Sequence, residues 1–208
     1  MKIQNNYNHT IYASYIGYIT QAIVNNYAPL LFLTFSKQFG LTLDRIALIT
    51  TINFAVQLVI DLVSAKLVDK IGYRVSVITA HVFAAAGLIF LAVLPSVLPD
   101  AYVGILISVV LYAIGEGLIE VWISPMVAAC PTEKKEAAMS LLHSFYCWGH
   151  VAVILISTLF FRIAGIEKWK FMAVFWALIP VFNCFYLAKV PIFSVTENRE
   201  PLTFGMNR

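Results

Sequence analysis

Two glutamates, Glu116 and Glu120, lie in the middle of a long apolar stretch of the sequence. They are four residues apart, so on a helix both carboxyls face one side, about 6 Å apart along the axis. A carboxylate at the centre of a membrane costs about 2.5–3.5 kcal/mol on insertion scales. Gly115 and Gly117 flank Glu116 and permit close approach of a helix or a ligand. The pair is expected either to bond a neighbouring helix as a protonated acid or to line a polar cavity, and the cavity is favoured.

Amide and acidic side chains recur at helical spacing in two earlier apolar stretches. They are Gln21, Asn25 and Asn26 in the first stretch and Asn53, Gln57 and Asp61 in the second. Such groups either hold helices together or bind a polar solute. Asp61 lies close to the expected cytoplasmic end, where it can reach lipid headgroups or Lys66, and this is favoured over a position in the same cavity.

The histidines offer a weaker signal. His143 and His150 lie in one apolar stretch with Trp148 between them, and each histidine is expected either to relay protons or to bond another helix as a neutral ring. Nothing places His81 and either of them on facing helices at equal depth, so haem ligation is not expected. No HExxH, GxSxG or glycine-rich phosphate loop occurs, and the cysteines form no CxxC pair. The sequence therefore predicts no enzyme, no metal and no other cofactor.

The composition indicates the environment in which these groups work. The chain has 208 residues, of which 61% are hydrophobic and 12% charged, and its mean hydropathy is +0.83. Soluble domains are about 45–50% apolar and about 25% charged, so disorder and most soluble classes are excluded. The net charge of +3 is too small to indicate a nucleic-acid partner. The apolar runs are too long for buried core helices and predict an integral membrane protein in a lipid bilayer.

Crossing about 30 Å of hydrocarbon takes about 20 helical residues. Six segments qualify, separated by polar loops that contain glycine, proline or charge: 11–34, 45–68, 75–95, 102–128, 138–163 and 169–189. The runs are too continuous for barrel strands, so the expected fold is all-α, with six transmembrane helices over residues 1–190. Residues 191–208 are expected to form a cytoplasmic tail or the start of a central linker.

Basic residues in the loops set the expected orientation. With both termini in the cytoplasm, nine lysines and arginines lie inside and five outside, which favours this orientation in a plasma (inner) membrane. Three of the five outside residues belong to the fifth loop, so the excess of basic residues on the cytoplasmic side is modest. A proline late in the first and fourth stretches, Pro29 and Pro125, is compatible with an inverted repeat of three plus three helices.

The loop after the second predicted span reads AKLVDKIGYR at 65–74. It resembles the signature loop of the major facilitator superfamily, written G-x-L-x-D-R-x-G-R-R. Four positions match: Asp69, Lys70, Gly72 and Arg74. Ala65 replaces the first glycine, and Tyr73 replaces a basic residue. Gly72 can turn the chain at a helix end, and the resemblance implies that Asp69 belongs to a charged latch between two transporter halves.

A second segment, GEGLIEVWISPMVAA at 115–129, is similar to the fourth-helix G-x-G-x-x-E-x-x-x-N-P-x-V segment of the fucose/glucose/galactose–proton symporters. Glu120 and Pro125 match, and Ser124 stands where asparagine is usual. The segment SLLHSFYCWG at 140–149 is similar to the fifth helix of that branch, and Asn25 and Asn26 are similar to its first.

This resemblance implies roles for individual residues. Glu120 is expected to be the carboxyl whose protonation is coupled to sugar binding, because a protonated acid can donate a hydrogen bond to a hydroxyl and a carboxylate cannot. The expected solute contacts are polar groups of the first and fourth helices and two tryptophans that could stack on a sugar: Gln21, Asn25, Asn26, Glu116, Trp122 and Trp148.

Transporters of this family have two six-helix halves with the solute between them. The chain is therefore expected to be the N-terminal half of a proton-coupled permease for a small neutral solute such as a sugar, with a second six-helix half as partner. A drug, nucleoside or organic anion stays open, the anion least favoured because no arginine lies deep in a span. A lone monomer is not expected to transport, because its polar face would meet lipid. The alternative is a non-transporting membrane interaction protein or degenerate half-transporter, whose polar residues hold helices together.

Overall fold

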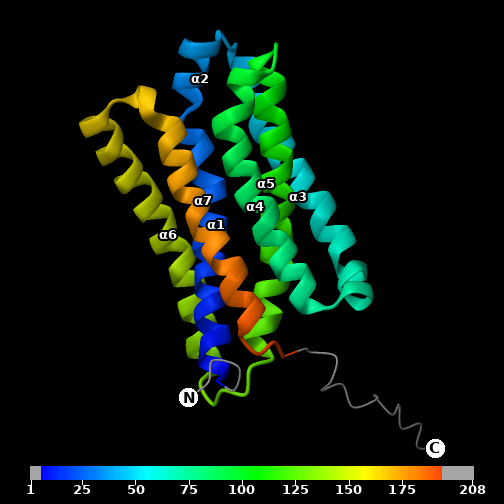
Figure 1. Ribbon diagram of the computed structural model, residues 1–208. Coiled ribbons are helices and arrows are strands. Elements are labelled where there is room, and N and C mark those ends of the chain that lie inside the picture. Colours follow the sequence, from blue (N-terminus) through cyan, green and yellow to red (C-terminus); the bar gives the residue numbers. More distant parts are fainter. Residues whose placement is uncertain (1–5, 194–208) are drawn as a thin grey trace, which may run out of the picture.

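The computed structural model describes residues 6–193, with the side chains of residues 65–70 outside the described part. In this part the chain forms seven α-helices and one 3-10 turn (Figure 1). The elements, in order, are α1 (Tyr7–Leu30), α2 (Phe32–Phe39), α3 (Leu43–Ile71), α4 (Tyr73–Val97), α5 (Ala101–Ala128), α6 (Lys135–Ala164), η2 (Ile166–Lys168) and α7 (Trp169–Lys189). The prediction of an all-α fold is confirmed.

Five of the described helices, α3 to α7, are long and apolar enough to cross a membrane. The helix α1 has 24 residues and therefore the length, but its tyrosines and amides make it more polar than the others. The count of six transmembrane helices includes α1 and stays a prediction. The inverted repeat of three plus three helices stays a prediction as well.

The first helix ends earlier than the predicted segment 11–34. Pro29 lies in its last turn, and proline has no N–H with which to continue the hydrogen-bond ladder. The N–H of Leu31 instead bonds the Ala28 carbonyl at 2.9 Å, which tightens the final turn. The short helix α2 follows at once and ends at Gly40, whose φ of 64° is left-handed. Sequence reasoning assigned most of α2 to a loop.

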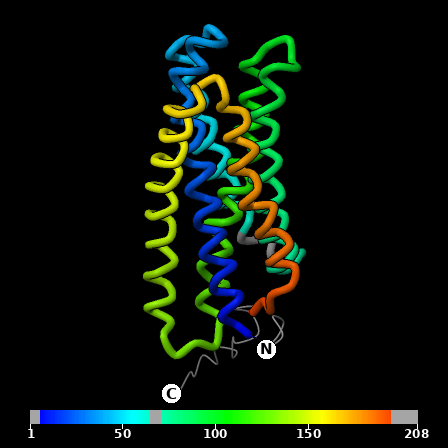
Figure 2. Tube along the Cα trace, turned by 60° about the vertical axis from the view of Figure 1, so that its left-hand side comes forward, coloured from blue at the N-terminus to red at the C-terminus, as the bar shows by residue number. Residues whose placement is uncertain are grey.

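Four helices form the centre of the bundle and two lie against it. The helices α1, α4, α5 and α7 pack on one another, whereas α3 packs mainly along α5 and α6 mainly along α1 (Figures 1 and 2). The helices α3 and α6 are accordingly the least buried of the long apolar helices. Each leaves a broad apolar face uncovered by the rest of the chain.

Two glycines allow the closest helix contact, between α4 and α5. A Cβ at Gly87 would lie 2.6 Å from the backbone nitrogen of Tyr112, and a Cβ at Gly115 would lie 2.6 Å from the Ala80 carbonyl oxygen. Neither helix can carry a side chain at these points without moving the other backbone. Such small-residue contacts are typical of helix pairs in membranes.

The apolar core consists of two clusters along the length of the bundle, with a polar layer between them. One cluster contains Ile23 and Ala113, and the other contains Tyr18 and Leu118. The positions between these pairs on α1 and α5 include Gln21 and the glutamate Glu116. The fold therefore collects the polar side chains of several helices at one depth, near the middle of the bundle.

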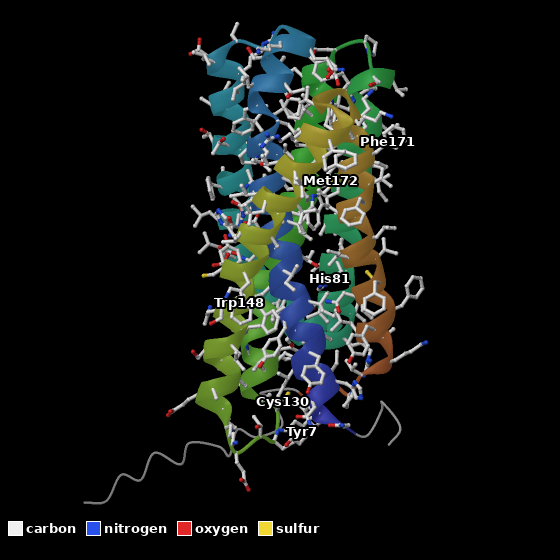
Figure 3. The ribbon with its side chains drawn as sticks, turned by 90° about the vertical axis from the view of Figure 1, so that its left-hand side faces the viewer. Tyr7, His81, Cys130, Trp148, Phe171 and Met172 are labelled. Carbon is white, nitrogen blue, oxygen red and sulfur yellow. The ribbon has the colours of Figure 1, made fainter. Side chains whose placement is uncertain are left out.

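Among residues of the second cluster a buried histidine joins three helices. The Nδ1 of His81 lies 2.7 Å from the Val77 carbonyl oxygen, which only accepts, so Nδ1 carries the proton and Nε2 is an acceptor. The Asn183 amide on α7 donates to that Nε2 at 2.8 Å and to the Ala13 carbonyl of α1 at 3.0 Å. Figure 3 shows His81 inside the bundle. These bonds assign a neutral ring that holds helices together.

The start of α1 and the end of α7 lie at the same end of the bundle (Figure 1). The His9 ring nitrogen Nδ1 and the Tyr186 hydroxyl are 2.7 Å apart, and the Thr10 hydroxyl donates to the Pro191 carbonyl. The two helices therefore stay in contact up to this end of the bundle.

Candidate functional site

An open pocket of about 370 Å³ lies against the polar layer. We call it the central pocket. Its lining comes from α1, α3, α5 and α6, and consists of Tyr18, Gln21, Asn25, Phe54, Gln57, Glu120, His143 and Tyr146. All of these side chains except Phe54 carry an amide, carboxyl, phenol or imidazole group, and the set includes no lysine or arginine. The pocket offers many hydrogen-bond donors and acceptors to a small polar molecule.

Glu120 on α5 is the charged centre of this pocket. Gln21 of α1 donates from Nε2 to Glu120 Oε2 at 3.1 Å, and Gln57 of α3 donates from Nε2 to the same oxygen. Two amide donors on one carboxyl oxygen fix the position of the side chain. Because the donors come from two other helices, the carboxyl also links α1, α3 and α5. Glu120 is itself exposed to the pocket.

Aromatic rings form the opposite wall. The Tyr18 hydroxyl and Ser124 Oγ are 2.6 Å apart, and the Tyr18 ring lies edge-on to His143 at 5.5 Å and to Tyr146 at 6.4 Å between centroids. The Asn25 amide donates to the Tyr146 hydroxyl at 3.5 Å. The wall combines ring faces with hydroxyl and amide groups, which suits a molecule that has both apolar and hydroxyl-bearing surfaces.

Glu116 lies behind this pocket rather than in it. Its side chain is 0% exposed, and neither carboxyl oxygen has a hydrogen-bond partner. The structure thus separates the two glutamates by environment although they share a helix face. Asp61 lies close by: its Oδ1 is 3.3 Å from the position of a Cβ on Gly117 and has no partner either. One oxygen of Asp61 is therefore buried against α5 and not turned to the lipid headgroups, and the predicted partner Lys66 has its side chain outside the described part.

The predicted solute contacts divide into two groups. Gln21 and Asn25 line the central pocket, whereas Asn26, Trp122 and Trp148 are not among its lining residues. The Asn26 amide donates to the Ala22 carbonyl of its own helix at 2.8 Å.

Trp122 and Trp148 point away from the central pocket for one geometric reason. Trp122 is buried against the Tyr73 ring at 5.5 Å, and Trp148 is 59% exposed on the outer face of α6 (Figure 3). Each tryptophan follows a pocket residue, Glu120 or Tyr146, by two positions. Two positions are about 200° around a helix, so the two side chains face opposite sides.

Sequence reasoning missed three of the lining residues: Tyr18, Phe54 and Tyr146. A signal for them was present in the helical spacing. Tyr18 precedes Gln21 by three residues, and Tyr146 follows His143 by three, so each shares a face with a polar residue already considered. Phe54 offers no such signal, because it is one apolar residue among many on α3.

The signature loop joins α3 to α4. Gly72 has φ 79° and ψ 156°, a conformation that is essentially restricted to glycine. Arg74 follows and donates to three carbonyl oxygens at the end of α7, those of Leu187 (2.9 Å), Ala188 (3.0 Å) and Val190 (2.9 Å). A guanidinium there satisfies carbonyls that the helix end leaves free. The side chains of Asp69 and Lys70 lie outside the described part.

Comparisons with known proteins find a family whose model matches both the signature loop and the helix bundle. The family model of the Major Facilitator Superfamily matches residues 14–203. A search of curated proteins finds no match.

One similar solved structure is that of the proton:xylose symporter XylE, a major facilitator superfamily protein bound to 6-bromo-6-deoxy-D-glucose. It aligns with a TM-score of 0.79 and 13% sequence identity over 89% of this chain. The chain spans 45% of the length of that structure, so it matches about half of a transporter. At this identity the similarity concerns the fold.

The superfamily consists of transporters rather than enzymes, and the apolar helices of this chain are those of a multi-pass membrane protein. The match of residues 14–203 covers most of the sequence and includes every helix from α2 to α7. The chain therefore belongs to the Major Facilitator Superfamily.

Proposed function

We propose that the chain is the N-terminal half of a proton-coupled permease for a small neutral solute such as a sugar. A second six-helix half, either a separate chain or another copy, closes the central pocket from the opposite side. The solute then reaches each side of the membrane in turn as the halves rock. Both termini of the chain face the cytoplasm, and the protein resides in the plasma (inner) membrane.

The observation that carries this proposal is the central pocket around Glu120. Its carboxyl is held by Gln21 and Gln57 from two other helices and remains exposed to the pocket. Amides, phenols and an imidazole surround it, and the named lining includes no lysine or arginine that would favour an anion. A polyhydroxylated neutral molecule matches such a lining, since every hydroxyl can both donate and accept.

The aromatic wall supports the same solute class. Tyr18 and Tyr146 bring ring surface and hydroxyl groups to one side of the pocket. Sugars have apolar ring faces edged by hydroxyls, and small-molecule sites commonly combine apolar surface with a few placed polar groups. The proton:xylose symporter XylE, similar in fold at 13% identity, adds support for a sugar and a proton.

The expected role of Glu120 is coupling. It is the one carboxyl among the named lining residues, and a change in its protonation changes what it can offer to a hydroxyl. Gln21 and Gln57 are its positioning residues and are expected to hold the carboxyl at the height of the solute.

The test uses membrane vesicles from cells that carry the gene at its own locus, so that any partner half is present. Uptake of a panel of radiolabelled neutral monosaccharides is measured with and without an imposed proton gradient. Gradient-driven accumulation is expected for at least one sugar. With Glu120→Gln, exchange of that sugar across the membrane is expected to continue while accumulation is lost. Accumulation that survives Glu120→Gln unchanged would contradict the coupling role.

A matched control is Glu133→Gln, which removes a carboxyl from an exposed loop position and should leave uptake unchanged. If no monosaccharide accumulates while the chain still co-purifies with a second membrane protein, the interaction-protein alternative is favoured instead. Purified monomeric chain in liposomes is expected not to transport.

A further inference from the structure

The side chain of Glu116 is the clearest departure from ordinary packing in this bundle. It is fully buried, and both of its oxygens lack a hydrogen-bond partner. Buried polar groups are nearly always paired, so an unpaired buried carboxyl requires an explanation. A negative charge at this place would be left without the donors that stabilise a carboxylate.

Glu120, one turn further along α5, has the opposite surroundings. It is exposed to the central pocket and accepts hydrogen bonds from the amides of Gln21 and Gln57. Glu120 thus receives two amide hydrogen bonds, whereas the amides of Asn25 and Asn53 lie beside Glu116 without making one to either of its oxygens. Two neighbouring acids with such different environments are suited to different protonation states.

The polar neighbours of Glu116 come from α1, α3, α6 and its own helix α5. The side chains of Asn25 on α1 and Asn53 on α3 lie beside it. Its titratable neighbours among the described side chains are Asp61 of α3, Tyr112 and Glu120 of α5, and Tyr146 of α6. These groups are acids and phenols, which oppose a second negative charge. The neutral acid is the form of Glu116 that this environment accepts.

Asn25 stands between Glu116 and the central pocket. It lines that pocket and also a smaller cavity of about 50 Å³, whose lining includes Asn53 and Tyr112. Its amide reaches the Tyr146 hydroxyl on the pocket side at 3.5 Å. Asn25 is therefore the amide side chain that borders both the central pocket and the smaller cavity. The smaller cavity is large enough for a bridging water molecule.

We propose that Glu116, and not Glu120, holds the coupled proton in the conformation of this structure, while Glu120 faces the solute as a carboxylate. The part of this proposal that concerns the solute rests on the proposed function. The two acids share one proton and one negative charge. When the proton moves, it leaves the O–H of Glu116 and joins a carboxylate oxygen of Glu120, so the negative charge moves from Glu120 to Glu116 and the total is conserved.

This division of roles gives Glu120 two functions at different times. As a carboxylate held by two glutamines, it accepts hydrogen bonds from solute hydroxyls. Once it has received the proton from Glu116, it can release those glutamines and exchange the proton with the opened pocket. The proton is thus kept away from water for as long as Glu116 holds it.

The test is infrared spectroscopy of the chain reconstituted in lipid vesicles at neutral pH. A protonated carboxylic acid has a C=O stretching band that a carboxylate lacks. The difference spectrum between the wild type and Glu116→Gln is expected to contain this band. Glu120→Gln and the surface control Glu133→Gln are expected to retain it. Glutamine has the shape of the protonated acid, and unchanged elution and melting of Glu116→Gln would show that the variant folds.

Asn25→Leu provides a second measurement. It replaces the amide that separates Glu116 from the pocket, so the shift of the Glu116 band in heavy water is expected to appear at least several-fold more slowly than in the wild type. A band that is absent from the wild type, that survives Glu116→Gln, or that disappears in Glu120→Gln alone would overturn the proposal.

The two proposals fail separately. If the band belongs to Glu116 but no sugar is accumulated in native vesicles, the buried proton site stands and the transport proposal is wrong. If sugar accumulates but the band does not belong to Glu116, transport stands and the proton is held elsewhere.

Discussion

The Asn183 amide of α7 donates a hydrogen bond of 2.8 Å to Nε2 of His81 on α4, deep inside the bundle. The same amide also donates to the Ala13 carbonyl of α1. One side chain thus joins three of the four central helices. The contact lies among residues of the second apolar cluster and, unlike the Glu120 site, contains no carboxyl group.

Asn183→Leu is expected to destabilise the protein by about 1–3 kcal/mol, because His81 Nε2 would be left buried without a donor and the Ala13 carbonyl would lose the hydrogen bond from α7. Thermal unfolding in detergent measures the effect. Phe185→Leu, at a position that is 68% exposed on the same helix, is the matched control and should melt with the wild type. Equal melting temperatures for Asn183→Leu and the wild type would mean that the contact adds no stability.

Arg74→Gln is expected to free the carbonyls of Leu187, Ala188 and Val190 and to loosen the end of α7. A hydrogen bond to a charged group contributes about 1.5–3 kcal/mol to stability, and it contributes less where water can take its place. Hydrogen exchange of the last turn of α7 should accelerate, while exchange in the middle of α4 should not change. Arg74→Lys keeps the charge but not the planar fork, so an intermediate rate is expected.

Gly115→Ala is expected to force α4 and α5 apart, since the new methyl would lie 2.6 Å from two backbone atoms of α4. Overpacking of this kind costs about 1–3 kcal/mol. Ala128→Val adds volume at an exposed position of the same helix and serves as the control. Tolerance of Gly115→Ala without loss of melting temperature would show that the two helices can separate freely.

Burial raises the pKa of the Cys130 thiol to about 11, although nearby Lys135 acts in the opposite direction. The thiol is therefore protonated at neutral pH, and only the thiolate reacts with iodoacetamide. Modification of Cys130 in the folded protein should be slow at neutral pH and should accelerate as pH rises toward that pKa. Mass spectrometry of the corresponding peptide follows the reaction, and rapid labelling of the native protein at neutral pH would contradict the burial of this side chain.

The helix positions could be predicted because apolar runs end at turn residues. The segment 169–189 coincides with α7, and 102–128 differs from α5 by a single residue. The break at Leu31 was missed because Pro29 lies inside an apolar run, where hydropathy gives no sign of a stop. The loop at 65–74 indicated the family from a few residues. Glycine and basic residues each have a specific physical role at a helix junction, and such a combination is therefore informative.

The composition of the site was harder to predict, because membrane helices are apolar on faces that meet lipid and on faces that meet protein. Hydropathy alone therefore does not fix the rotation of a helix about its axis. Gln21 and Asn25, predicted from their polarity, line the central pocket, whereas Trp122 and Trp148, predicted from residue type, do not. The difference between Glu116 and Glu120 depends on donors from α1 and α3, and such contacts between distant segments cannot be read from one helix.

The hydrogen bonds from His9 to Tyr186 and from Thr10 to Pro191 tie the beginning of α1 to the segment after α7. Two spin labels attached on either side of this junction should therefore keep a constant separation. Such a pair gives spectroscopists a fixed reference distance against which other distances in the protein can be compared.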